Sequence, residues 1–172
     1  NAFITGITGM VGSHLADYLL ANTDWNVYGF CRWNDSLDNL EHLFGRINEK
    51  DRIQLIYGDL NDLSSVVSAV EKAYVFHLAA QSYPQTSFVA PLETLETNIL
   101  GTAKVLEAIR KSPFTPVIHV CASSEVFGRV PAEFLPIKED CQFHPASPYA
   151  ISKVGTDLLG RYYAEAYGMT VM

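Results

Sequence analysis

Short runs of β-forming residues alternate with longer segments of helical spacing along the whole chain. Such alternation is typical of right-handed βαβ units that build a parallel sheet. Several of the predicted strands are apolar nearly throughout, as a sheet covered on both faces requires. The predicted strands are Ala2–Thr5, Val27–Cys31, Ile53–Ile56, Tyr74–Leu78 and Pro116–Cys121. The predicted helices are Met10–Ala21, Leu37–Asn48, Leu63–Glu71, Pro91–Ser112 and Pro148–Tyr167. The pattern predicts an α/β fold, a doubly wound parallel Rossmann sheet with helices on both faces.

The two ends of the chain bear on its domain organisation. Its 172 residues, 48% hydrophobic and 18% charged, have room for one ordinary domain with a sizeable core. Asn1 stands almost inside the first predicted strand, and Gly168–Met172 stops where another strand should begin. A doubly wound sheet usually continues for at least one more strand, and often into a second lobe that shapes the substrate pocket. We therefore expect residues 1–172 to be a nucleotide-binding Rossmann domain, truncated before a C-terminal substrate lobe.

Charge and cysteine usage exclude several classes of protein. Asp and Glu total 19 against 12 Lys and Arg, and no basic run offers a surface for nucleic acid or for an anionic membrane. Cys31, Cys121 and Cys141 stand at wide spacings that fit neither a disulfide framework nor a zinc site. The apolar stretch Ala73–Ala80 is interrupted by His77 and is too short to cross a bilayer. We expect a soluble, cytoplasmic protein without a metal.

Three glycines at a spacing of three directly follow the first predicted strand. Gly6 permits a sharp turn, Gly9 lets backbone N–H groups approach a pyrophosphate, and Gly12 lets helix and strand pack closely. A strand before this turn and a helix after it form the context that a dinucleotide-binding motif needs. The cofactor-binding residues predicted here are Gly6, Thr8, Gly9, Met10, Val11 and Gly12.

The end of the second predicted strand bears on the choice between NAD and NADP. An acid that grips the adenosine ribose 2′-hydroxyl should lie about 20 residues beyond the glycines, but Phe30–Asn34 contains none. Arg32 instead occupies the place where a guanidinium can pair with a 2′-phosphate. NADP is therefore favoured over NAD.

Two further strand ends complete the predicted cofactor site. Asp59 and Leu60 follow the third predicted strand, and Leu78, Ala79 and Ala80 end or follow the fourth. Ligands of open α/β sheets lie at this carboxyl edge, where small alanines let a flat ring or a ribose approach the backbone. Asp59 either accepts a hydrogen bond from the adenine amino group or caps the next helix. His77 is expected to be part of the buried structure.

Tyr149 and Lys153 stand four residues apart in the last predicted helix, so they share one face. A free phenol is a poor base at neutrality because it ionises only near pH 10. A fixed ammonium beside it stabilises the phenolate, so Lys153 makes Tyr149 usable as a base. Ser123, at the end of the fifth predicted strand, would hydrogen-bond the same substrate oxygen from the opposite side. Together with a nicotinamide, these residues specify alcohol–carbonyl redox chemistry.

With these residues assembled, the chain resembles the extended short-chain dehydrogenase/reductase family. Within that family it is most similar to the nucleotide-sugar branch, and above all to GDP-mannose 4,6-dehydratases and their reductase relatives. The resemblance is carried by Thr5–Gly12, Asp59–Leu60, His77–Ser82, Thr97–Thr102, Ser123–Gly128 and Tyr149–Lys153. One departure is Gly9-Met10-Val11-Gly12, where many GDP-mannose dehydratases carry Gly-Gln-Asp-Gly.

The resemblance implies an NADP-dependent nucleotide-sugar 4,6-dehydratase that converts GDP-mannose to GDP-4-keto-6-deoxymannose. Glu125 matches the glutamate that removes the C5 proton in the dehydratases, two residues after the catalytic serine. Ser124 fills the position that assists departure of the C6 hydroxyl, and Gln81 and Ser82 are expected sugar contacts. The alternatives are a 4-ketosugar reductase, a 4-epimerase with the same triad, or a cofactor-binding module without turnover. The complete set of Ser123, Tyr149 and Lys153 argues against the module.

The two longest predicted helices resemble the pair that family members use in a four-helix dimer interface. They are Pro91–Ser112 and Pro148–Tyr167. We therefore expect a homo-oligomer, either a dimer or a tetramer.

Overall fold

The computed structural model describes residues 1–48, 51–69, 74–114 and 116–172. Its five strands form one parallel sheet in the order β3-β2-β1-β4-β5. The strands are β1 (Ala2–Thr5), β2 (Val27–Cys31), β3 (Ile53–Tyr57), β4 (Tyr74–His77) and β5 (Ile118–Val120). The strand order reverses between β1 and β4, which is the switch point of a doubly wound sheet. The sequence predicts every one of these strands, with bounds that differ by no more than two residues.

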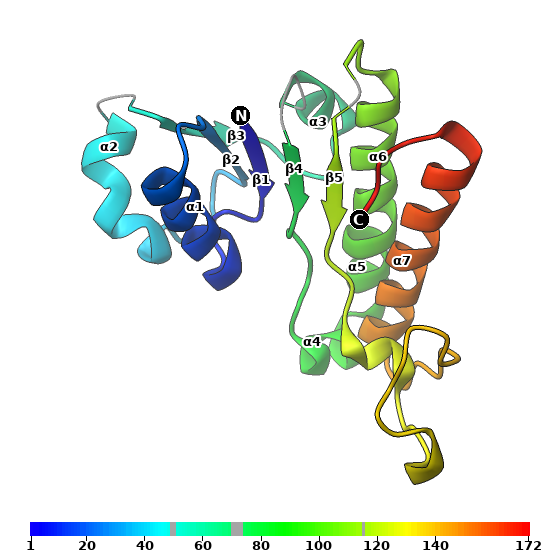
Figure 1. Cartoon of the computed structure of the whole chain (residues 1–172). Coiled ribbons are helices and arrows are strands. Elements are labelled where there is room, and N and C mark those ends of the chain that lie inside the picture. The colour runs from blue at the N-terminus through cyan, green and yellow to red at the C-terminus, as the bar shows by residue number, and fades with distance from the viewer. Residues whose placement is uncertain (49–50, 70–73, 115) are drawn as a thin grey trace.

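Helices cover both faces of the sheet, as expected (Figure 1). Side chains alternate between the faces along β1: Phe3 packs in the core beneath α6 (Gly101–Lys111), and Ala2 and Ile4 pack in the core beneath α1 (Met10–Asn22). The helices are α1 (Met10–Asn22), α2 (Phe44–Asn48), α3 (Leu63–Ala69), α4 (Pro84–Val89), α5 (Pro91–Leu95), α6 (Gly101–Lys111) and α7 (Pro148–Tyr167). 3-10 turns span Asp38–Leu43, Ser124–Phe127 and Ala132–Phe134.

Three predicted helices differ in detail from the structure. The helix expected over Pro91–Ser112 is divided, because Glu96–Leu100 forms a π-helical turn between α5 and α6. The helix expected over Leu37–Asn48 starts as the 3-10 turn that precedes α2. The last two residues of the predicted Leu63–Glu71 lie outside the described residues. The sequence analysis did not predict α4, a short helix that begins with a proline at its first position.

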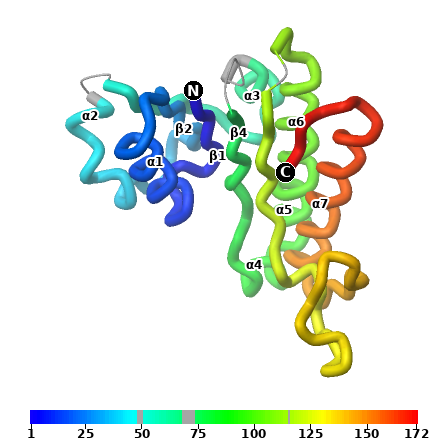
Figure 2. The backbone as a smooth tube through the Cα atoms, in the orientation of Figure 1, coloured from blue at the N-terminus to red at the C-terminus, as the bar shows by residue number. Residues whose placement is uncertain are grey.

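The residues after α7 return to the sheet beside β5 (Figure 2). Ile118 N donates to Thr170 O at 3.0 Å, Met172 N donates to Ile118 O at 2.8 Å, and Val120 N donates to Met172 O at 2.7 Å. These bonds form a parallel pairing next to β5, with Val171 opposite Ile118. Residues 170–172 thus pair with β5 at the place where the sequence predicts a further strand.

Candidate functional site

A cleft of about 300 Å³ lies where the loops leave the carboxyl ends of β1 to β4. Eleven of the predicted cofactor and sugar residues line it: Gly6, Thr8, Gly9, Arg32, Asp59, Leu60, Leu78, Ala79, Ala80, Gln81 and Ser82. The same cleft is lined by Asp35, Gly58 and Asn61, which the sequence analysis did not select. Segments up to 91 residues apart in sequence, from Gly6 to Thr97, thus form one site at the edge where open α/β sheets bind ligands.

The glycine turn has the tight geometry that its spacing predicts. Gly6 adopts a φ of +74°, and a Cβ built on it would lie 2.8 Å from Ala79 Cα. A Cβ on Gly12 would overlap Gly6 O, so the first turn of α1 packs directly on the loop. Gly9 N donates to Gly6 O at 3.0 Å, and the side chain of Asn39 holds Thr8 O at 2.8 Å. Contacts within the protein itself therefore hold the turn in this conformation.

The N-terminus of α1 adjoins this cleft. Gly9 is the N-cap residue and supplies no side chain, and Met10, Val11 and Gly12 form the first helical turn. The first N–H groups of a helix have no intrahelical acceptor and carry the positive end of the helix dipole. Because Gly9 adds no Cβ to the cleft wall, an anion can approach these groups closely. The residues present fit the pyrophosphate of a dinucleotide.

The end of β2 differs from the expectation in one respect. No acid ends this strand, but Asp35 lies beside Arg32: Arg32 Nε is 2.9 Å from Asp35 Oδ1, and Arg32 N donates to Asp35 Oδ2 at 3.0 Å. Burial and the charge of Asp35 raise the pKa of the Cys31 thiol to about 11, so Cys31 is neutral here. Asp35 was not predicted from the sequence, although its spacing of three from Arg32 permits a turn that pairs them.

Asp59 lines the cleft and does not cap α3. Its Oδ1 accepts from Asn61 N at 2.8 Å within the loop. The cap is Asp62, whose carboxylate accepts from Ser64 N at 3.0 Å and from Ser65 N at 3.3 Å. Hydrogen bonds from Ser65 and Ser64 hold the pKa of Asp62 below its usual value. Helix capping, one of the two roles predicted for Asp59, is therefore performed by Asp62.

The predicted catalytic residues lie where β5 and α7 approach each other. Ser123 begins the 3-10 turn after β5, and its Oγ accepts from Glu125 N at 3.2 Å. Ser124 and Glu125 are exposed in that turn, which packs against α7. On α7, Ser147 Oγ accepts from Ala150 N at 3.0 Å and caps the helix, which places Tyr149 in the first turn with 8% of its surface exposed.

Lys153 occupies a buried position beside Tyr149. Its Nζ lies 6.0 Å from the centroid of the Tyr149 ring and donates to Cys121 O at 2.8 Å. Burial lowers the pKa of Lys153, and the nearby Cys121 acts in the opposite direction. The bond to Cys121 O ties the ammonium to the end of β5. A cation is thus held beside the phenol, as the four-residue spacing predicts.

A buried asparagine that the sequence analysis left without a role joins three parts of the site. Asn98 Oδ1 accepts from Gln81 N at 2.8 Å, and Asn98 Nδ2 donates to Gln81 O at 3.0 Å and to Ser152 Oγ at 2.8 Å. Asn98 lies in the π-helical turn, and Ser152 precedes Lys153 on α7. The signal that could have revealed it is a poor helix former inside a long helical pattern.

Two residues near the cleft are already bonded within the protein. Gln81 Nε2 donates to Tyr83 O at 3.1 Å and to Thr94 Oγ1 at 3.2 Å, although Gln81 lines the cleft. The His77 ring lies between Thr5 Oγ1 at 2.8 Å and Thr102 Oγ1 at 3.0 Å. Burial and the charge of Lys153 lower the pKa of His77 to about 3, so the ring is neutral. His77 is part of the buried structure, as expected.

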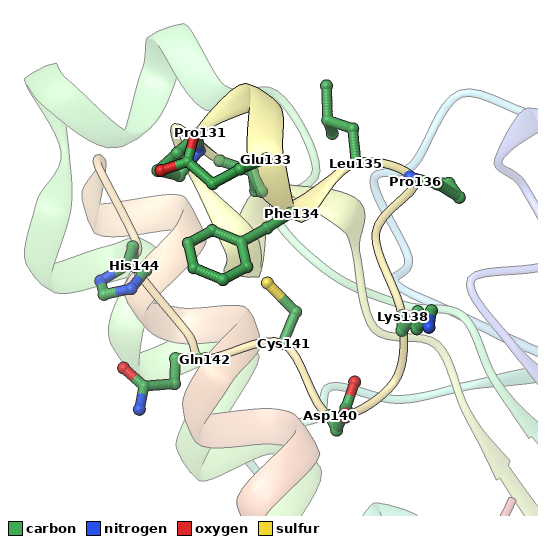
Figure 3. Close-up of a pocket in the computed structure, with 11 residues that line it drawn as sticks. Pro131, Glu133, Phe134, Leu135, Pro136, Lys138, Asp140, Cys141, Gln142 and His144 are labelled. Atoms are coloured by element: carbon green, nitrogen blue, oxygen red, sulfur yellow. The ribbon is translucent and has the colours of Figure 1, made fainter.

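A larger cavity of about 640 Å³ lies in the loop between β5 and α7 (Figure 3). The Phe134 ring and the Cys141 thiol point toward one another in it, while Leu135 points away. This loop joins the turn that carries Glu125 to the helix that carries Tyr149. The residues that line this cavity lie between Val130 and His144, and they include none of the predicted catalytic or cofactor-binding residues.

In residues 1–48, 51–69, 74–114 and 116–172, no group of three or more His, Cys, Asp or Glu side chains is arranged to hold a metal ion. Over the same ranges, no helix combines the length and apolar character needed to span a membrane.

Comparison with known proteins places this arrangement in a family. The profile of the family described as GDP-mannose 4,6 dehydratase matches residues 3–172. The chain belongs to the GDP-mannose 4,6-dehydratase family. This family is part of the nucleotide-sugar branch of the extended short-chain dehydrogenases/reductases, so the resemblance given by the motifs is confirmed.

Relatives and solved structures agree with membership of the GDP-mannose 4,6-dehydratase family. GDP-mannose 4,6 dehydratase 2 of Caenorhabditis elegans is 36% identical over 178 residues, which cover 98% of this chain and 46% of that protein. The dTDP-glucose 4,6-dehydratase DesIV of Streptomyces venezuelae, solved with NAD, has a TM-score of 0.88 at 26% identity, covering 99% of this chain and 53% of that one. RMD of Pseudomonas aeruginosa, solved with NADPH, has a TM-score of 0.74 at 28% identity, covering 99% and 51%. The chain spans about half the length of the curated relatives it matches.

Proposed function

We propose that this chain is the cofactor-binding and catalytic domain of an NADP-dependent nucleotide-sugar 4,6-dehydratase that acts on GDP-mannose. The observation that carries the proposal is the buried ammonium of Lys153 beside the Tyr149 ring, at the same sheet edge as the glycine turn. A Tyr–Lys pair without a function would normally lie at the surface, because burial of an ammonium costs free energy. The family and the 36% identical dehydratase of Caenorhabditis elegans support the choice of reaction.

The first step of the proposed reaction oxidises the sugar at C4. Lys153 stabilises Tyr149 electrostatically as a phenolate, the phenolate takes the proton of the C4 hydroxyl, and Ser123 holds the sugar oxygen. When bound, the nicotinamide supplies a reversible acceptor for the hydride that leaves C4. The C4 carbon becomes a ketone, with one proton on Tyr149.

The second step eliminates water across C5 and C6. The new ketone acidifies the C5 proton, which Glu125 removes as a general base. The C6 hydroxyl departs as water with the proton that Glu125 took, assisted by Ser124. C6 would then take back the hydride and C5 the proton held on Tyr149, so the net products are GDP-4-keto-6-deoxymannose and water. Ser124 and Glu125 are exposed in the turn after Ser123, and they can therefore face a sugar.

The preference for NADP rests on the end of β2. Arg32 lines the cleft with an exposed guanidinium, and the thiol before it is neutral. Asp35 binds Arg32 Nε, which leaves the Nη groups in place for a 2′-phosphate. In Arg32→Ala we expect NADP affinity to drop roughly 10- to 100-fold, with a much smaller change for NAD. Equal losses measured by calorimetry would remove the argument.

The wider organisation is part of the same proposal. We assign residues 1–172 to the cofactor domain of a longer cytoplasmic protein, whose substrate lobe makes further sugar contacts beside Gln81 and Ser82. Exposed apolar side chains on α5 and α7 support a homo-oligomer formed through these helices. They include Leu92, Ile151, Leu158 and Tyr162.

The decisive experiment supplies the protein with GDP-mannose and no added reductant. We expect a 4-keto-6-deoxy sugar with no net change in the absorbance of NADPH. Steady consumption of NADPH would indicate a 4-ketosugar reductase, and a 4-epimer would indicate an epimerase. In Glu125→Gln, elimination should stop while partial reduction of the cofactor persists; dehydration at the normal rate would show that Glu125 is not the base.

A further inference from the structure

An exposed tryptophan stands at the outer edge of the cofactor cleft. Trp33 follows β2 in a turn closed by the bond from Asp35 N to Arg32 O at 3.2 Å, and 82% of its surface is exposed. Arg32 and Asp35, on either side of this turn, both line the cleft. The turn therefore holds a large aromatic ring next to the cleft wall, where nothing in the described fold covers it.

A second aromatic residue holds the first in place. The Trp33 and Tyr57 rings meet edge to face, with centroids 4.9 Å apart and an interplanar angle of 67°. Tyr57 ends β3, and its next neighbours Gly58 and Asp59 line the same cleft. The pair thus bridges the two loops that form this end of the cleft. An edge-to-face contact uses the edge of one ring and leaves an indole face available to a ligand.

We propose that the free face of Trp33 stacks on the adenine ring of the bound nicotinamide cofactor. The inference rests on the proposed function, because it takes the occupant of the cleft to be a dinucleotide. The glycine turn holds the pyrophosphate at the start of α1, and the adenosine half then extends toward the ends of β2 and β3. Adenine is flat and aromatic, so it can stack on the exposed indole face of Trp33. Asp59, on the opposite loop, can accept a hydrogen bond from the adenine amino group.

The chain offers a matched control at the opposite end of the sheet. It contains two tryptophans, and the other, Trp25, stacks on Tyr74 with centroids 5.0 Å apart. Trp25 precedes β2 and Tyr74 begins β4, so this pair lies at the amino ends of the strands. Each tryptophan can therefore serve as the sole fluorescent reporter of one end.

The test uses fragments of the cofactor that carry adenine without nicotinamide. In Trp25→Phe, where Trp33 is the only indole, ADP and 2′,5′-ADP should quench the emission as they saturate the site. In Trp33→Phe, where Trp25 is the only indole, the same fragments should leave the emission unchanged. Nicotinamide mononucleotide serves as the probe that lacks adenine, and it should not quench Trp33 by contact.

Affinity provides the second readout, measured by calorimetry on the 172-residue chain. Trp33→Ala should weaken binding of 2′,5′-ADP about tenfold, Trp33→Phe should restore most of that loss, and Trp25→Phe should bind as the unmodified chain does. Circular dichroism should show that each variant is folded.

Three outcomes would overturn the inference. The first is unquenched Trp33 at saturating ADP, and the second is unchanged affinity in Trp33→Ala. The third is quenching by GDP and not by ADP, which would place the nucleotide of the substrate on Trp33 instead. If the unmodified chain binds neither ADP nor NADP, the proposed function itself has failed, which is a distinct result.

Discussion

The two ends of helix α1 show how differently this protein treats the two edges of its sheet. At the amino edge of the strands, Arg52 donates to Leu20 O at 2.6 Å and to Thr23 O at 2.5 Å, so a guanidinium satisfies the carbonyls that end α1. At the carboxyl edge, the N-cap of α1 is Gly9, which offers no side chain to the first N–H groups. One end is closed by the protein, and the other is left for a ligand.

The two tryptophan–tyrosine pairs repeat the contrast. Trp25 lies flat on Tyr74, with an interplanar angle of 20°, and packs partly against the core. Trp33 meets Tyr57 edge to face and remains largely exposed. Similar residues therefore complete the structure at one edge and extend a binding site at the other. Substitutions at the carboxyl edge should change ligand binding and catalysis, and those at the amino edge should change stability alone.

The largest expected effect is at the carboxyl edge. Tyr149→Phe removes the proton acceptor for the C4 hydroxyl, and the rate of C4 oxidation should fall about 10²- to 10⁴-fold. The free energy of unfolding should change little, because only one oxygen is lost from the first turn of α7. Single-turnover kinetics with GDP-mannose measure the rate, and calorimetry should show cofactor still bound. A normal oxidation rate would refute the assigned base.

Substitutions of two glycines of the turn should distinguish an effect on stability from an effect on cofactor binding. In Gly12→Ala the new Cβ overlaps Gly6 O, so stability should fall by about 3 kcal/mol and cofactor affinity should fall with it. In Gly9→Ala the nearest atom to the new Cβ is Gly6 O at 3.3 Å, so affinity should fall with little loss of stability. Urea unfolding measures the stability of each variant, and cofactor titration measures its affinity. Equal stability losses would contradict the packing argument.

Arg52→Met tests the amino edge. The variant leaves the carbonyls that end α1 without their charged donor, and stability should fall by about 2 kcal/mol. Cofactor affinity should match that of the unmodified protein, since Arg52 is at the far end of α1. Urea unfolding and calorimetry report the two quantities. A parallel loss of affinity would break the separation of the two edges.

The smallest expected effect is a dependence on pH. The pKa of His77 is about 3 in the folded protein and near 6.5 when unfolded, so the unfolded state binds a proton first as pH falls. His77 should therefore contribute stability that is present above pH 6.5 and is lost on acidification, by about 1.4 kcal/mol between pH 7.5 and 5.5. The free energy of unfolding, measured for the protein and for His77→Gln at both pH values, isolates the contribution of His77. An identical pH dependence in the two would exclude His77 as its source.

Local patterns in the sequence determined much of this protein. The alternation of β-rich runs and helical segments indicates the parallel sheet, because strands buried on both faces must be apolar. The glycine spacing indicates the turn over α1, because only a residue without a Cβ fits against Gly6 O. The spacing of Tyr149 and Lys153 indicates a shared helix face, because four residues complete about one turn.

Only the tertiary structure decided which groups meet across long sequence separations. It pairs Arg52 with the end of α1, places Asn98 on the backbone of Gln81, and sets Trp33 against Tyr57. These contacts depend on how strands and helices pack, and no local propensity or spacing encodes them. The sequence thus predicts the groups that we propose to react at the carboxyl edge, while folding determines what holds them there and what closes the opposite edge.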